Sequence, residues 1–235
     1  MVELLKKDLK ILAVIPARGG SKGILRKNLA LVGGRPLIAW SIAAAINSGV
    51  CHDVIVSTDD EEIADVAKAY GANVPFMRPA SLAKDDSPIF EALNHVLDKY
   101  EDKDITHILQ LNPTSPLRTE NHIKEVYDQW DGNCESIVSV CKAHTHPYWC
   151  KKLDKQGRIK DFLDKGPDQF KIRQELPDVY ALTGAIFLVS KDLVRANTYY
   201  SDKTYAYIME ASDALDIDEP WELYLANLIL RDRKM

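Results

Sequence analysis

The chain has 235 residues, of which 46% are hydrophobic and 28% are charged, with 11 Gly and 11 Pro. This balance is typical of a globular protein, and it excludes disordered, collagen-like and coiled-coil chains. A net charge of −5 gives no global attraction to nucleic acid or to an anionic membrane. Any binding of phosphate groups therefore depends on a local cluster of cations.

Cysteine usage and the N-terminal region indicate a cytoplasmic protein. Cys51, Cys134, Cys141 and Cys150 show no C-x-x-C spacing, so we expect reduced thiols, most of them buried. The apolar run Ile11–Pro16 is too short for a signal sequence or a membrane span. We expect one domain over residues 1–235, with no membrane association.

Short apolar runs alternate with helical patterns along most of the chain. Residues 10–16 form a continuous β-branched run, which is typical of a strand buried on both faces of a parallel sheet. Further strands are predicted at 53–58, 106–112, 136–140, 180–189 and 204–209, an extended piece at 74–78, and helices at 36–49, 59–71, 87–100, 119–130 and 220–230. Strands separated by single helices predict right-handed crossovers and an α/β fold with a doubly wound, mostly parallel sheet.

The alternation is interrupted between residues 142 and 179. This segment is polar and rich in turn residues, with only fragmentary strand patterns such as residues 148–153. We interpret it as an inserted hairpin or arm that leaves the main sheet. An arm too small for its own core is suited to dimerisation.

The most informative motif is the loop Ala17–Asn28, which follows the first predicted strand. A loop at the carboxyl end of a strand in an open α/β sheet is where ligands bind. Its glycines allow backbone N–H groups to approach an anion. The loop also carries four cations, Arg18, Lys22, Arg26 and Lys27. This combination indicates a nucleoside triphosphate site; the alternative is a solvated loop.

Two known phosphate-binding motifs do not fit this loop. A Walker loop requires Ser or Thr after its lysine, whereas Gly23 follows Lys22. The G-x-G-x-x-G dinucleotide fingerprint is absent as well. The loop therefore belongs to another class of phosphate site.

A pair of carboxylates, Asp216 and Asp218, lies near the C-terminus. In extended chain, residues i and i+2 point to the same side, so both can face one site while Ile217 turns into the core. Two oxygen ligands beside a phosphate site suit Mg²⁺, and Mn²⁺ also accepts carboxylate oxygen. The alternative is that Asp218 caps the last helix.

Two other motifs are less informative. The run from Asn112 to Arg118 follows a strand and contains two prolines, which predicts a rigid turn. It either contacts a ligand or is a stiff loop leading into a helix capped by Thr119. His144 and His146 have metal-like spacing without a companion ligand, so no metal site is predicted there.

Taken together, these motifs resemble the acylneuraminate cytidylyltransferases, or CMP-sugar synthetases. The resemblance spans nearly the whole chain, through IPARGGSKGILRKN, STDDEEIA, RPASLAKDDS, NPTSPLR, RQELP, TGAIF and ALDIDEPWEL. It implies a Rossmann-like nucleotidyltransferase that joins CTP to the anomeric hydroxyl of a nine-carbon 2-keto sugar acid. It also implies a homodimer in which the arm of one subunit reaches over the active site of the other.

The resemblance also assigns roles to individual residues. It implies that the nucleotide is held by Arg18, Ser21, Lys22, Lys27, Asn28, Arg78 and Ser87, that the sugar acid is bound by Asn112, Arg173 and Gln174, and that Mg²⁺ is held by Asp216 and Asp218. We expect Arg18 and Lys22 to offset charge on the leaving pyrophosphate, and Asp218 to act in catalysis through the Mg²⁺ that it holds with Asp216.

Several positions depart from the family pattern. Leu25 stands where Pro is usual, Asn112 where Gln is usual, Thr183 where Asn is frequent and Phe187 where Tyr is common. The nucleotide side therefore matches better than the sugar side, which leaves legionaminic acid or another nonulosonate open beside N-acetylneuraminate. The eight-carbon Kdo enzymes fit less well.

Two other classes of protein were weighed. In a nucleotide-sugar glycosyltransferase, the Asp-x-Asp pair falls in the middle of the chain and the first loop lacks the cations. A non-catalytic nucleotide-binding relative would lack phosphate cations or metal carboxylates, yet Arg18, Lys22, Asp216 and Asp218 are all present. Both alternatives are disfavoured.

Overall fold

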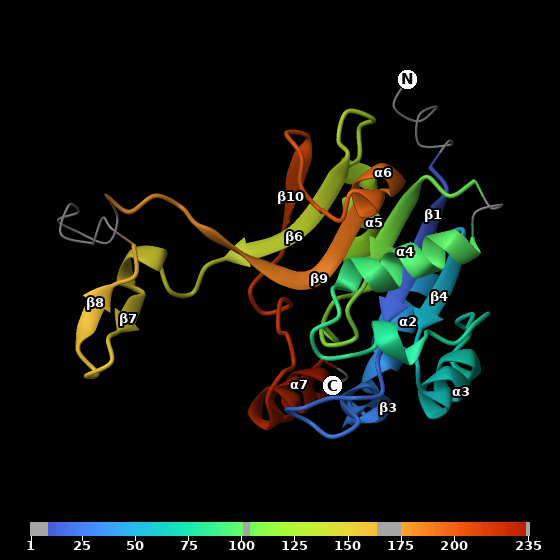
Figure 1. The fold of residues 1–235 in the computed structure, drawn as a ribbon, viewed down its shortest axis with the longest axis horizontal. Coiled ribbons are helices and arrows are strands. Elements are labelled where there is room, and N and C mark those ends of the chain that lie inside the picture. The colour runs from blue at the N-terminus through green and yellow to red at the C-terminus, as the bar shows by residue number, and fades with distance from the viewer. Residues whose placement is uncertain (1–8, 101–103, 164–174, 234–235) are drawn as a thin grey trace.

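A computed structural model describes residues 9–100, 104–163 and 175–233. Its centre is a six-stranded sheet in the order β10-β6-β9-β5-β1-β4 (Figure 1). The strands are β1 (Ile11–Pro16), β4 (Asp53–Ser57), β5 (His107–Gln110), β6 (Ser136–Lys142), β9 (Tyr180–Ser190) and β10 (Thr204–Ile208). β1 is parallel to β4 and β5, β6 is parallel to β10, and β9 runs antiparallel between β5 and β6. The predicted mostly parallel sheet is confirmed.

Helices cover both faces of the sheet. Alternate residues of β1 point to opposite sides, so Ile11, Ala13 and Ile15 join one core cluster, whereas Leu12 and Val14 join the other. The first cluster is covered by α2 (Leu37–Ser48), α3 (Glu61–Ala69) and α5 (Glu120–Gln129), and the second by α4 (Ile89–Lys99) and α6 (Lys191–Arg195). The sheet is therefore doubly wound, as the β-branched run predicted.

A third, smaller cluster packs the C-terminal region against the start of the chain. The last helix, α7 (Pro220–Asp232), contributes Ala226 and Leu230 to it, and Ile217 precedes that helix. They meet Val32 of a short hairpin made of β2 (Leu31–Val32) and β3 (Arg35–Pro36). The remaining short helices are η1 (Lys27–Leu29), η2 (Ala80–Leu82) and η4 (Pro147–Trp149). This cluster holds the Asp216–Asp218 segment beside the loop after β1.

One predicted element does not form as a strand. In the extended piece at 74–78, no ladder is made, and only Asn73 pairs with Ile55 in an isolated bridge. Pro75 lies in that piece, and a proline has no backbone N–H to donate to a strand ladder. The expectation that most cysteines are buried was also wrong: Cys134 is buried, Cys51 and Cys141 are half-buried, and Cys150 is exposed.

The arm, residues 142–179, leaves the sheet between β6 and β9 (Figure 1). It carries the hairpin of β7 (Lys151–Leu153) and β8 (Ile159–Asp161), both fully exposed strands. An isolated two-stranded hairpin is marginally stable, since it buries little apolar surface. The arm is therefore a projecting insertion without a core of its own among its described residues.

The expected sugar-binding residues of the arm and the expected lack of membrane association remain to be compared with the structure. Arg173 and Gln174, the expected sugar-binding residues of the arm, lie outside the described residues. Within the described ranges, no helix is both long and apolar enough to cross a membrane.

Candidate active site

An open cavity of about 460 Å³ lies where the loops after β1 and β5 meet the segment before α7. It is the place at which an α/β sheet of this kind binds ligands, beyond the carboxyl ends of its strands. Most of the predicted site residues line it: Arg18, Ser21, Lys22, Lys27, Asn28, Arg78, Ser87, Asn112 and Asp218. Segments separated by about 200 positions in the chain are thus brought to one site.

Two cations of the β1 loop share one carboxylate. Arg18 Nη1 lies 2.6 Å from Asp85 Oδ1, and Lys22 Nζ lies 2.7 Å from Asp85 Oδ2. These ion pairs hold the pKa of Asp85 below its ordinary value, with the contact to Lys22 as the largest cause. Asp85 therefore stays charged at neutral pH and occupies the position of an anion between the two cations.

A third cation connects the loop to the acidic pair. Lys27 Nζ donates to Asp218 Oδ1 and to the carbonyl oxygen of Ile217, both at 2.8 Å. Its side chain is largely buried, whereas that of Asp218 is 73% exposed. Lys27 therefore keeps the Asp218 carboxylate at the cavity rim while leaving it accessible.

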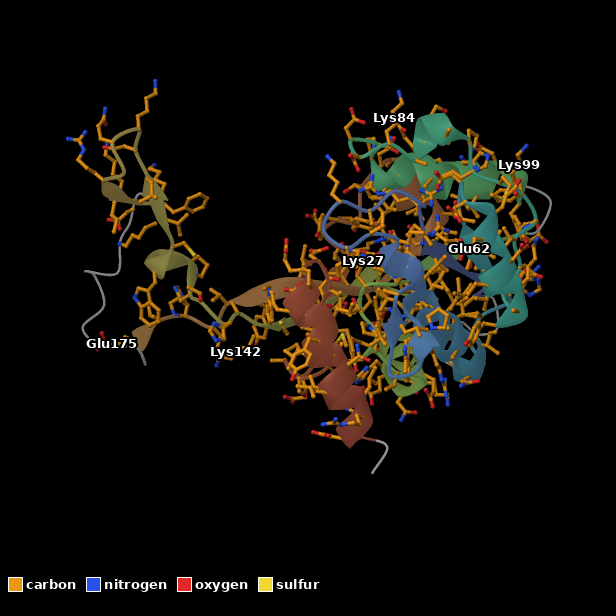
Figure 2. The ribbon with its side chains drawn as sticks, turned by 90° about the horizontal axis from the view of Figure 1, so that it is seen from below. Lys27, Glu62, Lys84, Lys99, Lys142 and Glu175 are labelled. Atoms are coloured by element: carbon orange, nitrogen blue, oxygen red, sulfur yellow. The ribbon has the colours of Figure 1, made fainter. Side chains whose placement is uncertain are left out.

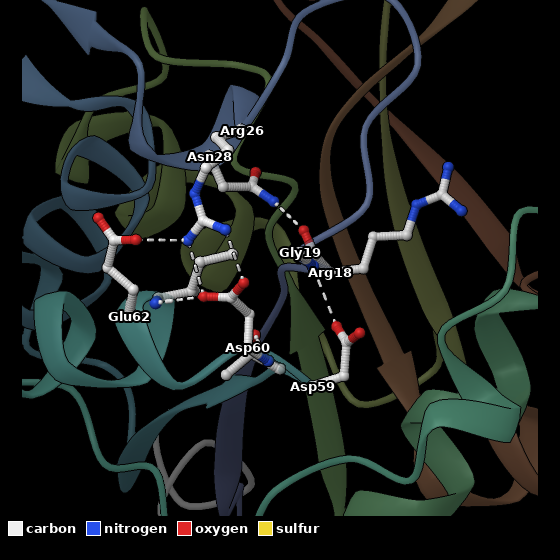
Figure 3. Close-up of polar contacts among 9 residues, drawn as sticks. Arg18, Gly19, Arg26, Asn28, Asp59, Asp60 and Glu62 are labelled. Carbon is white, nitrogen blue, oxygen red and sulfur yellow. Dashed lines mark hydrogen bonds and ion pairs between the residues drawn. The ribbon is translucent and has the colours of Figure 1, made fainter.

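The fourth cation of the loop, Arg26, does not face the cavity. Its guanidinium binds both carboxylate oxygens of Asp60, at 3.0 and 2.9 Å, and also Glu62 (Figure 3). Arg26 and Arg18 extend in different directions in Figure 3. The expectation of four phosphate cations was therefore wrong for Arg26, which anchors the loop to the start of α3.

Close packing fixes the path of the β1 loop. Gly19 N–H donates to Asp59 Oδ1 at 3.0 Å, so it is not free for an anion, and a Cβ on Gly19 would lie 2.7 Å from Asp60 Oδ2. Asn28 Nδ2 donates to the Arg18 carbonyl at 2.9 Å (Figure 3). A Cβ on Gly23 would overlap the Asp218 carbonyl oxygen, whereas one on Gly20 would meet nothing within 4 Å.

Arg78 and Ser87 form the side of the cavity towards α4. Arg78 is buried, and its guanidinium donates to the Ser57 carbonyl. Burial lowers the pKa of Arg78 below its ordinary value. Its own N–H donates to the Thr58 carbonyl, and Ser87 Oγ donates to the Ser81 carbonyl. The loop that carries Asp85 is thereby fastened to the sheet at Arg78.

The acidic pair has Ile217 turned into the core as predicted, but only Asp218 lines the cavity. Ile217 is fully buried, and its N–H donates to the Thr114 carbonyl at 2.8 Å. Asp216 is half-buried, and its Oδ1 has no hydrogen-bond partner among the described residues. Burial raises the pKa of Asp216, and the Asp218 charge raises it further.

The alternative role of Asp218 as a helix cap is wrong. Glu219 caps α7 through a reciprocal capping box with Glu222. Asp218 is therefore free of that task and faces the cavity. No group of three His, Cys, Asp or Glu residues suited to a metal occurs within the described ranges. Two carboxylates nevertheless fit Mg²⁺, because this ion keeps several waters and binds substrate phosphates, and Asp216 Oδ1 is a buried carboxylate oxygen without a hydrogen-bond partner among the described residues.

The loop after β5 has one part at the cavity and another part in the core. Asn112, Pro113 and Thr114 line the cavity. Arg118 is instead buried, and it donates to the carbonyls of Asn112 and Ala185 at 3.2 and 2.9 Å. Burial lowers the pKa of Arg118 to about 9. Arg118 therefore holds the loop rather than a ligand.

Asp85 is the main residue that sequence reasoning missed. It lies within the family run RPASLAKDDS, so the position was recognised without a role. An acid is not expected at a site for anions, and only the structure shows that it pairs with both loop cations. His146, by contrast, lies outside this cavity and contacts Tyr148 and Pro177.

The basic loop, the facing carboxylates and the doubly wound sheet together define an α/β enzyme of the nucleotidyltransferase type. A family model described as cytidylyltransferase matches residues 12–166, and the chain belongs to that family. The resemblance noted in the sequence is thus confirmed, and the activity of the family is the CTP-dependent transfer of a cytidylyl group.

Similar proteins extend over nearly the whole chain. A CMP-N,N'-diacetyllegionaminic acid synthase of Legionella pneumophila is 37% identical, covering 92% of this chain and 94% of its own. A pseudaminic acid cytidylyltransferase of Campylobacter jejuni is 30% identical, covering 95% and 97%. An N-acylneuraminate cytidylyltransferase of Streptococcus agalactiae is 35% identical over 89% of this chain and 51% of its own.

Solved structures agree on the fold. A CMP:2-keto-3-deoxy-manno-octonic acid synthetase complexed with CTP superposes with a TM-score of 0.72 at 16% identity, covering 95% of this chain and 99% of that one. At this identity, the likeness concerns the fold alone.

Proposed function

We propose that this enzyme transfers CMP from CTP to the anomeric hydroxyl of a nine-carbon 2-keto sugar acid of the sialic and legionaminic type, releasing pyrophosphate. The observation that carries the proposal is the cavity that brings Arg18, Lys22 and Lys27 together with Asp218. The similar proteins named for legionaminic, pseudaminic and acylneuraminic acids support the class of sugar acid.

In the proposed reaction, the sugar hydroxyl attacks the α-phosphorus in line while pyrophosphate leaves. Arg18 and Lys22 bind the triphosphate tail and offset the charge that grows on the leaving group. Both exchange the Asp85 carboxylate for phosphate oxygens when CTP enters. Ser21 and Asn28 adjoin the tail and the ribose, and Arg78 and Ser87 form the wall for the cytosine.

Asp216 and Asp218 would hold Mg²⁺, with Mn²⁺ as the other ion of suitable chemistry. When bound, this ion screens phosphate charge and lowers the pKa of a coordinated hydroxyl. Lys27 contributes by fixing the Asp218 carboxylate, and the buried environment of Asp216 favours pairing of its free oxygen with a cation.

The proposal includes a cytoplasmic homodimer in which the arm reaches a second subunit. Four unpaired cysteines support a reducing compartment. Figure 2 shows Lys142 and Glu175 on the arm, which stands clear of the body that carries Lys27 and Lys84. Leu153 and Ile159 are 68% and 70% exposed there, so apolar surface is available for a partner. Arg173 and Gln174 would approach the sugar acid in the partner's site.

The test is pyrophosphate release from CTP and Mg²⁺ with N-acetylneuraminate, legionaminate, pseudaminate, Kdn and Kdo. Release with a nine-carbon acid is the expected result, and the preferred acid names the substrate. Release with Kdo alone would move the enzyme to the eight-carbon class. CTP binding without turnover on any acid would reject the proposal in favour of a non-catalytic relative.

A further inference from the structure

A chain of hydrogen bonds runs from Tyr199 to the cavity. Tyr199 Oη donates to Gln110 Oε1 at 2.6 Å, and Gln110 Nε2 donates to Asn112 Oδ1 at 2.9 Å. Gln110 is 3% exposed and is the last residue of β5, opposite Phe187 of β9. Asn112, two residues further on, lines the cavity. These hydrogen bonds therefore connect the half-buried phenol of Tyr199 to a predicted sugar-binding residue.

The phenol of Tyr199 determines which group donates and which accepts in each of these hydrogen bonds. The Tyr199 ring stacks on Phe187 and leans on Phe90, each with ring centroids 4.5 Å apart. Burial raises the pKa of Tyr199 to about 12, so the phenol keeps its proton at neutral pH. A buried O–H must donate to avoid the cost of an unpaired donor. Gln110 therefore presents its carbonyl oxygen to Tyr199 and its NH₂ group to Asn112.

This direction decides how Asn112 meets a ligand. Its Oδ1 is occupied by Gln110, so its Nδ2 is left to donate, and no described residue accepts from it. Its backbone carbonyl is held by Ser41 Oγ at 3.1 Å and by Arg118 Nη1 at 3.2 Å. A Cβ on Gly184 would lie 3.5 Å from Nδ2, and the glycine leaves that space open.

We infer that Tyr199 and Gln110 are positioning residues, which hold the Asn112 amide so that its NH₂ group donates to an acceptor oxygen of the sugar acid. This inference rests on the proposed function and deepens its sugar side. A side chain held in advance pays less ordering cost when the ligand binds. A site built to donate also discriminates against ligands that lack the matching acceptor.

The experiment compares Tyr199→Phe with Tyr200→Phe, a matched loss of a neighbouring phenol that is outside the chain. We expect Tyr199→Phe to raise KM for the sugar acid about fivefold, the effect of one lost hydrogen bond. KM for CTP should stay within about twofold, because the phosphate cations are untouched. Tyr200→Phe should change neither constant.

The variant Gln110→Met and the double variant Tyr199→Phe/Gln110→Met test whether Tyr199 acts on Asn112 through Gln110. We expect the double variant to resemble Gln110→Met alone, since removing the middle of a chain already disconnects its far end. An unchanged sugar-acid KM in Tyr199→Phe, or an equal rise in both KM values, would overturn the inference. Melting temperatures of all variants show whether a change reflects unfolding.

A second readout keeps the inference separate from the proposed function. If the wild-type enzyme turns over no sugar acid, the function fails, and the side-chain amide resonance of Asn112 then decides the inference. A change in the chemical shift of this Asn112 resonance in Tyr199→Phe, with no change in Tyr200→Phe, supports the inferred hydrogen-bond connection from Tyr199 to Asn112. An Asn112 resonance that is unchanged in both variants rejects it.

Discussion

The cavity wall and the arm are built in opposite ways. In the wall, loops distant in sequence are joined by short polar contacts: Lys27 to Asp218, and Arg18 and Lys22 to Asp85. In the arm, a short hairpin exposes Leu153 and Ile159 and packs against no core cluster. The first region is organised before any ligand binds, whereas the second presents apolar surface outward.

This difference between the wall and the arm suggests a separate role for each region. The proposed nucleotide side lies within the body, where Arg18 and Lys22 contact Asp85 and Lys27 contacts Asp218. The arm has exposed side chains and no such support among its described residues. Substitutions in the wall should therefore change catalysis, and substitutions in the arm should change association.

The largest effect is expected for Asp218→Ala. Loss of this carboxylate removes a proposed metal ligand and leaves Lys27 without its anionic partner. We expect kcat/KM to fall about hundredfold or more, which is about 2.7 kcal/mol of transition-state stabilisation. Steady-state pyrophosphate release measures it. The control is Asp232→Ala, an exposed acid of α7, and a loss below about tenfold for Asp218→Ala would remove the metal role.

Gly23→Ala should have the next largest effect. The added Cβ overlaps the Asp218 carbonyl oxygen, a backbone atom that cannot rotate away. We expect kcat/KM to fall about tenfold, because misplacement of catalytic groups by about 1 Å is costly. Gly20→Ala is the matched control, since its Cβ meets open space. Equal activities of the two variants would show that the contact between these loops does not matter.

Most of the fold could be predicted from local sequence patterns. The β1 run is buried on both faces because helices pack on both sides of it, and the breaks at Gly49 and Gly71 mark the ends of α2 and α3. The extended piece expected at 74–78 does not pair as a strand, because local apolar content does not reveal whether a ladder partner is available. Non-local pairing decides that outcome.

The sequence predicted most of the residues that line the cavity, but it did not predict which charged side chains pair with each other. Residues that line the cavity lie in loops directly after strands, where the fold places ligands. Sequence counted Arg26 with the phosphate cations, but its left-handed backbone, with φ of 52°, turns it towards Asp60. The contact of Asp85 with Arg18 depends on the path of a whole loop, which no local motif encodes.

Asp85→Asn should have a moderate effect in the opposite direction. The carboxylate competes with the triphosphate for Arg18 and Lys22, so its neutralisation releases both cations. We expect Kd for CTP to fall about three- to tenfold, the order of one charged contact of modest strength. Isothermal titration with CTP measures it.

The control for that prediction is Asp86→Asn. It removes the same charge from the neighbouring position, where the structure records no ion pair with any described residue. An equal gain in both variants would mean that the general field, and not the Asp85 contact, sets the affinity. Weaker CTP binding in Asp85→Asn would instead make Asp85 a support that orients the two cations.

The smallest effect on the stability of the body is expected for Ile159→Asp, a substitution in the arm. Ile159 is exposed and faces Leu153 across the hairpin, so the body loses no packing. We expect the free energy of unfolding to change by less than about 0.5 kcal/mol, while self-association weakens. Urea unfolding at low concentration and sedimentation measure the two quantities.

Lys160→Asp is the control for the arm, because residue 160 lies on the opposite face of the same strand. If apolar contact between subunits is what the arm provides, the charge at 159 disrupts association and the charge at 160 does not. A loss of about 1 kcal/mol or more in unfolding free energy for Ile159→Asp would show that the arm packs on its own body. Unchanged sedimentation in both variants would exclude the β7–β8 hairpin from the interface, so that any partner surface must then lie outside this hairpin.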